Sequence, residues 1–98
     1  MTQAELIALL RDCLTLWGEE GTLAAGDASV LLTTAAGRFE IAAAPVANRP
    51  VRWLLHTPAR VAAGRPARRH NSITGLLSAL RNELGAQVGN RLRVGPIT

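Results

Sequence analysis

The sequence predicts an α+β domain, a two-layer sandwich in which two helices cover one face of a three- or four-stranded antiparallel sheet. Two segments repeat apolar residues at helical spacing, and three short β-type runs follow one another between them, separated by short gaps. The 98 residues are enough for one core and too few for two, so residues 1–98 are one domain. The expected order is α-β-β-β-α, with room for a last strand.

Residues 2–17 are predicted to form the first helix. Thr2 and Glu5 have the spacing of a capping box, and Gly18 is suited to end the helix. Its apolar stripe consists of Leu6, Leu9, Leu10, Cys13 and Trp17. The glycine-rich and acidic residues 18–27 follow as a predicted loop.

Three strands are expected next, at residues 29–34, 38–43 and 51–57. The first two are separated by a hairpin-sized gap that contains Gly37. Alternation places Trp53 on the opposite face from its neighbour Arg52, so the indole is expected to face the core. One face of the sheet is therefore covered and the other is left open.

Residues 59–70 show no periodicity and are predicted to be a long, exposed basic loop. The second helix is expected to begin at Asn71 or Ser72, either of which is a good N-cap, and to end near Gly85. Its apolar stripe consists of Ile73, Leu76, Leu77, Leu80 and Leu84. Residues 90–94 alternate arginine with apolar side chains and leave room for a short final strand.

Positive charge is concentrated in the second half of the chain. Residues 1–48 hold two arginines and six acidic residues, a net charge of −4, whereas residues 49–98 hold nine arginines and one glutamate, a net charge of +8. Such an asymmetry favours docking to an anionic partner. The absence of lysine is typical of a GC-rich genome, and we expect a bacterial origin.

The candidate site is a surface for phosphate or nucleic acid, built around the basic loop and the start of the second helix, where free N–H groups already favour an anion. A basic extension over the open sheet face is expected from the third strand and the tail. The candidate residues are Arg60, Arg65, Arg68, Arg69, His70, Ser72, Arg52, Arg91 and Arg93.

The sequence also allows two alternatives to an anion-binding surface. The loop arginines can instead pair with Glu19, Glu20 or Asp27 and serve only solubility. The open sheet face, with Leu31 and Leu54, can instead belong to a homodimer or another protein-interaction module without ligand chemistry.

The order of elements is similar to that of double-stranded-RNA-binding domains, in which basic residues stand at the start of the last helix. Here Arg68, Arg69 and His70 carry that likeness. The glycine-proline-histidine loop of that family is missing, because the first turn contains Ala35, Ala36 and Gly37. The likeness therefore concerns the order of elements alone.

No catalytic constellation is visible, and we expect a binding protein without enzymatic activity, cofactor or metal. Cys13 falls on the apolar stripe of the first helix, and neither His56 nor His70 has an acidic neighbour at metal-ligand spacing. The single cysteine and the lack of a signal peptide or a long apolar run predict a cytoplasmic protein that does not enter a membrane.

Overall fold

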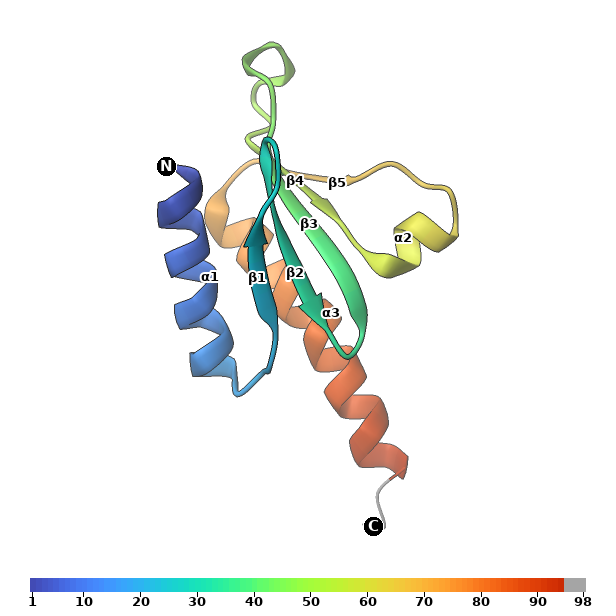
Figure 1. The fold of residues 1–98 in the computed structure, drawn as a ribbon. Helices are drawn as coiled ribbons and strands as arrows, with labels where there is room; N and C mark the ends of the chain where they lie inside the picture. Colours follow the sequence, from blue (N-terminus) through green and yellow to red (C-terminus); the bar gives the residue numbers. More distant parts are fainter. Residues whose placement is uncertain (95–98) are drawn as a thin grey trace.

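A computed structural model describes the backbone of residues 1–94 and the side chains of residues 1–47 and 49–85. The elements follow one another in the order α-β-β-β-β-α-β-α, with a 3₁₀ turn in the β3–β4 connection (Figure 1). They are α1 (Gln3–Trp17), β1 (Thr22–Ala25), β2 (Ser29–Thr34), β3 (Gly37–Ala43), η1 (Val46–Asn48), β4 (Trp53–His56), α2 (Pro58–Ala62), β5 (Arg68–His70) and α3 (Ile73–Val94).

The five strands form one antiparallel sheet in the order β1-β2-β3-β4-β5, so each strand pairs with its neighbours in the chain. The predicted α+β class and the antiparallel sheet are confirmed. The strand number and the order of elements are corrected, because β1 and β5 lie in segments that were predicted to be loops. The extra strands also remove the likeness in element order to double-stranded-RNA-binding domains.

The first helix begins as predicted. Thr2 Oγ1 accepts a hydrogen bond from the Glu5 amide at 3.1 Å, and the Glu5 carboxylate accepts one from the Thr2 amide at 2.8 Å. Gly18 ends the helix in the left-handed conformation, with φ 71°. Both ends of α1 are therefore set by short-range hydrogen bonding.

The second long helix begins as predicted but runs further. Ser72 Oγ accepts a hydrogen bond from the Gly75 amide at 3.0 Å, which identifies Ser72 as the N-cap. Gly85 lies inside α3 and does not end it, and the predicted strand at 90–94 is wrong because that backbone is helical. Glycine lowers helix stability without preventing a helix that already packs on a sheet.

The core lies between the sheet and the two long helices, which cover the same sheet face (Figure 1). Helix α1 packs on β1 and β2, and α3 packs on β4 and β5. The buried apolar side chains are Leu6, Leu10, Leu14, Val30, Leu32, Phe39, Ile41, Leu55, Leu76, Ala79, Leu80 and Leu84. The domain is therefore a two-layer α/β arrangement with one covered sheet face, as predicted.

Side chains alternate between the two faces of the sheet, so the strand residues that do not point toward α1 and α3 lie on the other face, which we call the open face. Residues that pair directly in an antiparallel ladder share a face. The open face consists of Thr22, Ala24, Ser29, Leu31, Thr33, Arg38, Glu40, Ala42, Leu54, His56 and Arg69.

The segment from 58 to 67, which we call the arch, connects β4 to β5. Thr57 caps its short helix α2 by accepting a hydrogen bond from the Arg60 amide at 3.2 Å, and Pro58 occupies the first turn. A Cβ at Gly37 would lie 2.8 Å from Pro58 Cγ, so α2 packs closely on the turn between β2 and β3. Glycine is required there for this approach and for its φ of 124°.

Candidate anion-binding surface

The arch is tied to the open face by polar contacts. His56 Nε2, from the open face, lies 3.1 Å from the carbonyl oxygen of Arg65, a hydrogen-bond distance when that ring nitrogen carries the proton. Within the arch, Arg60 Nε donates to the carbonyl oxygen of Pro66 at 2.7 Å, and the Arg65 amide donates to the Arg60 carbonyl oxygen at 2.8 Å. These bonds hold the loop over the sheet on the side opposite α1 and α3.

Four predicted site residues lie on the open-face side. Arg69 belongs to the open face through its pairing with Leu54, while Arg60 and Arg65 belong to the arch. Arg52 extends β4 by one residue, because its amide donates to the His70 carbonyl oxygen at 2.9 Å and its own carbonyl oxygen accepts from Ala44. The next residue, Trp53, packs against the core on the helix-covered face. Because side chains alternate along a strand, Arg52 points to the open face.

Two predicted site residues lie on the other side of the sheet. Arg68 pairs with Leu55 and His70 pairs with Trp53, so both face the helix layer. The strand β5 therefore divides the predicted Arg68–His70 cluster, because successive side chains of a strand point to opposite faces. A cluster that is continuous in the sequence is not continuous on the surface.

His70 is placed as a packing residue between β5 and α3. Its Nε2 is buried and has no hydrogen-bond partner among the described residues. Its pKa is lowered, first by burial and second by the positive charge of Arg68. A neutral, half-buried imidazole is unsuited to anion binding, whereas Ser72 uses its hydroxyl oxygen for the α3 cap.

Arg91 and Arg93 lie outside the residues whose side chains are described. Conversely, the structure adds one arginine that the sequence analysis did not select. Arg38 is exposed on the open face, where it lines a groove together with Glu40 and His56. The position of Arg38 on the open face follows from the register of β3 against β2 and β4. The sequence did not suggest it, because Arg38 is one of only two arginines in the acidic first half of the chain.

The acidic residues are distributed differently from the arginines. Glu40 is the one carboxylate of the open face, and one of its oxygens accepts a hydrogen bond from Ser29 Oγ at 2.9 Å. Glu5 is engaged by the α1 cap, Asp12 lies on α1, Glu83 lies on α3, Glu19 and Glu20 lie in the loop that follows α1, and Asp27 lies in the turn between β1 and β2. The alternative in which Glu19, Glu20 or Asp27 pairs with the loop arginines gains no support, since none of the described side chains forms such an ion pair.

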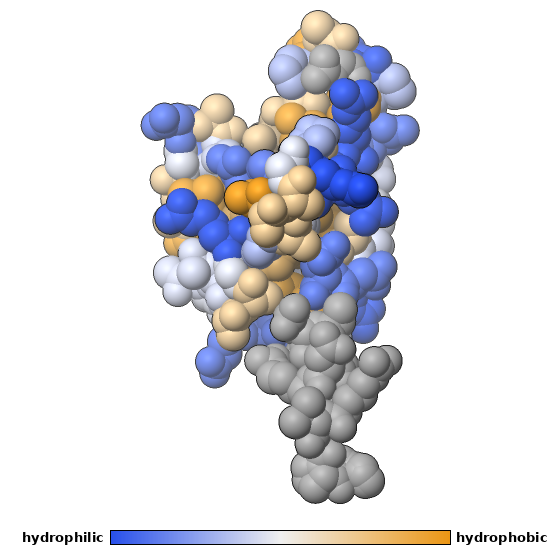
Figure 2. All heavy atoms as spheres, turned by 90° about the vertical axis from the view of Figure 1, so that its right-hand side faces the viewer, coloured by the Kyte–Doolittle hydropathy of each residue, from blue (hydrophilic) through white to orange (hydrophobic). Residues whose placement is uncertain are grey.

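A groove runs between the arch and the open face. It has a volume of about 480 Å³ and is lined by Leu31, Arg38, Glu40, His56, Pro58, Val61 and Ala62. Seen from the α2 side, strongly hydrophilic surface lies on both sides of a paler, apolar area (Figure 2). Arg38 therefore lines the same groove as the apolar residues Leu31 and Val61.

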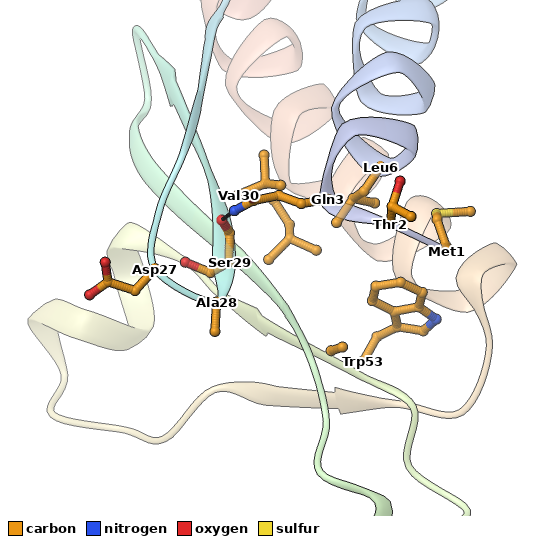
Figure 3. Close-up of a pocket in the computed structure, with 11 residues that line it drawn as sticks. Met1, Thr2, Gln3, Leu6, Asp27, Ala28, Ser29, Val30 and Trp53 are labelled. Atoms are coloured by element: carbon orange, nitrogen blue, oxygen red, sulfur yellow. Dashed lines mark hydrogen bonds between the residues drawn. The ribbon is translucent and has the colours of Figure 1, made fainter.

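A second hollow, of about 170 Å³, lies below the start of α1. Figure 3 shows Gln3 reaching from α1 toward Ser29, with Trp53 on the neighbouring wall. Gln3 Nε2 donates to the carbonyl oxygens of Gly26 and Ser29 at 2.9 and 2.6 Å, so its polar group is already bonded to the turn between β1 and β2. This contact connects α1 to the sheet and occupies both N–H donors of the Gln3 amide group.

Catalytic and metal chemistry have little support in the described part of the chain. No group of three histidine, cysteine or acidic side chains lies close enough together there to hold a metal ion. Cys13 is half-buried on α1, and burial, followed by the charge of Asp12, raises the pKa of its thiol, which disfavours the reactive thiolate. Within residues 1–94, no helix combines the length and the apolar character needed to cross a membrane.

Comparisons with protein-family models, with curated proteins and with solved structures found no match to this chain.

Proposed function

We propose that this chain is a binding domain whose open face and arch engage an anionic partner, with nucleic acid as the first class to test. The observation that carries the proposal is the charge of this side of the molecule. Arginines from four segments gather there, namely Arg38, Arg52, Arg60, Arg65 and Arg69, and the open face has Glu40 as its one carboxylate.

Guanidinium groups suit this role because each presents several N–H donors in a planar fork that matches phosphate and carboxylate oxygens. Arg38, Arg52, Arg65 and Arg69 are exposed, so a partner can reach them without rearrangement of the core. A surface with this excess of guanidinium groups also raises the rate at which an anionic partner meets it.

The test is the salt dependence of binding to a labelled oligonucleotide. Binding through phosphate contacts weakens steeply as salt rises, because neutralised phosphates release counterions. We expect Arg65→Ala/Arg69→Ala to weaken binding and to reduce the salt dependence. A matched double variant, Arg11→Ala/Arg81→Ala, removes two exposed arginines carried by α1 and α3. Equal affinity of both double variants and the parent chain would refute the proposal.

A second candidate function is a protein-interaction module, as the homodimer or partner-binding alternative anticipated. The groove on the open face favours it, because apolar surface beside arginines suits a protein better than a phosphate backbone. Light scattering at high salt separates a homodimer held by this apolar surface from a monomer.

A further inference from the structure

The apolar wall of the groove is not explained by packing of the domain itself. Helix α2 has no buried residue, and Val61 is 59% exposed beside the groove that it lines. Leu31 contributes a half-buried apolar side chain from β2. Exposed apolar side chains that meet around a hollow are typical of surfaces that are covered by another molecule.

The charged side chains around the groove restrict what that molecule is. Arg38 lines the groove itself, and Arg60 and Arg65 lie in the arch beside it. Glu40 also lines it and keeps its negative charge while it accepts a hydrogen bond from Ser29, so the excess of positive charge around the groove comes from the two arch arginines. Charge complementarity therefore favours an occupant with carboxylates or other anionic groups next to its apolar parts.

The aromatic side chains argue against a nucleic acid as the occupant of this groove. Phe39 is buried, and Trp17 and Trp53 pack against the core, so the three aromatic residues of the chain all belong to the helix side of the sheet. Single strands are bound by stacking of bases on exposed rings, which the open face lacks. A phosphate backbone also gains nothing from contact with Leu31 and Val61.

The extent of the surface argues for a polypeptide over a small molecule. The groove floor is provided by β2, β3 and His56 at the end of β4, whereas Arg52 lies at the other end of β4 and Arg69 lies on β5. A partner that uses both the groove and these arginines has to extend over several strands. A chain with alternating apolar and acidic side chains meets that requirement.

We propose that the groove between the arch and the open face binds an acidic amphipathic segment of another protein. Its apolar side chains rest on Leu31 and Val61, and its carboxylates pair with Arg38 and the arch arginines. This inference rests on the proposed function, because it keeps an anionic partner on the open face and arch, but it puts a protein segment in place of nucleic acid as the class that occupies the groove. It goes further by making apolar contact a condition for binding.

The test begins with selection of a random displayed peptide library on the immobilised full chain. We expect enrichment of peptides that combine Leu, Ile, Val or Phe with Asp or Glu. The affinity of one enriched peptide is then measured by fluorescence anisotropy for the parent chain and its variants. The expected loss is about tenfold or more for Val61→Asn and for Arg38→Gln.

The chain offers a matched control for each variant. Val46 is 71% exposed in η1, outside the groove, so Val46→Asn makes the same chemical change elsewhere. Arg11 is exposed on α1, on the helix side of the sheet, so Arg11→Gln removes an equal charge there. Neither control is expected to change peptide affinity, and circular dichroism verifies that every variant is folded.

Other outcomes separate this inference from the proposed function. If affinity depends on Arg38, Arg65 and Arg69 but not on Val61, the partner is held by charge alone, and the inference fails while the proposed function stands. If the chain binds an oligonucleotide but no peptides are enriched, the inference also fails and the proposed function stands, with nucleic acid as the partner. If neither peptides nor oligonucleotides bind, both proposals fail.

Discussion

Leu54 and Arg69 are direct partners in the ladder between β4 and β5, so the guanidinium group of Arg69 belongs to the open face. The adjacent pair, Leu55 and Arg68, faces the helix layer. Arg68 and Arg69 are neighbours in the sequence but lie on opposite faces of the sheet.

The first prediction compares these two arginines. Arg69→Ala is expected to weaken binding of an anionic partner. For an oligonucleotide, it is also expected to bring the negative slope of log K against log salt closer to zero by about 1. Arg68→Ala is expected to leave that slope unchanged, because its side chain points away from the open face. The measurement is a salt titration of both variants by fluorescence anisotropy. Equal effects of both substitutions would contradict the assignment of faces.

The second prediction concerns the pH dependence of stability. The pKa of His70 is lowered from 6.5 in the folded chain, so the unfolded chain binds more protons at this residue as pH falls through about 6.5. The free energy of unfolding is therefore expected to decrease as the pH falls below that value.

The variant His70→Phe removes this titration and retains an aromatic ring. Urea unfolding at about pH 7.5 and pH 5.5 is expected to show a smaller difference in stability for the variant than for the parent chain. A histidine titration by NMR measures the pKa of His70 directly. An unshifted or raised pKa would contradict this reading of the buried Nε2.

The third prediction concerns two glycines in different surroundings. Gly37→Ala is expected to destabilise the domain by at least about 1 kcal/mol, because φ is 124° and the new Cβ would lie 2.8 Å from Pro58 Cγ. Gly85→Ala is expected to stabilise it by about 0.5–1 kcal/mol, because Gly85 lies inside α3 with no atom within 4 Å of the new Cβ. Thermal or urea unfolding measures both, and effects of the same sign would contradict the structure.

The fourth prediction concerns the α1 cap. Thr2→Ala is expected to cost about 1 kcal/mol, because it removes the acceptor for the Glu5 amide. The pKa of Glu5 is lowered first by the hydrogen bond from the Thr2 amide and second by the interaction with the Thr2 side chain. Alanine keeps the amide and removes the hydroxyl, so this pKa is expected to rise only in part in the variant. Thr15→Ala, on the exposed face of the same helix, is the control. Equal free energies of unfolding for Thr2→Ala and the parent chain would contradict the capping role of the Thr2 hydroxyl.

The α1 boundaries and the β2–β3 hairpin could be predicted from the sequence because they depend on local chemistry. Thr2 and Glu5 cap each other within one helical turn, and Gly37 supplies a conformation that few other residues adopt. The prediction that Trp53 faces the core was also correct, since alternation needs only the strand to be recognised. For these elements the required contacts lie within a few residues.

The strands β1 and β5 could not be predicted in the same way. Arg68, Arg69 and His70 have no strand-like composition, and they pair because β4 presents an unpaired edge that the arch brings within reach. The groove likewise joins Leu31 of β2 to Val61 of α2, residues that are distant in the sequence.

The sequence by itself determined the fold class, the one-sided burial of the sheet and the excess of arginine in the second half of the chain, since composition and periodicity express these directly. Only the tertiary structure decided which arginines lie on the same side of the sheet. Strand pairing assigned Arg69 to the open face and Arg68 to the helix layer, and it placed Arg38, from the acidic half of the sequence, beside the arch. The physical reason is that strand pairing decides which side chains from different strands become neighbours, and alternation decides which face each side chain occupies. Both depend on contacts between residues that are distant in the sequence.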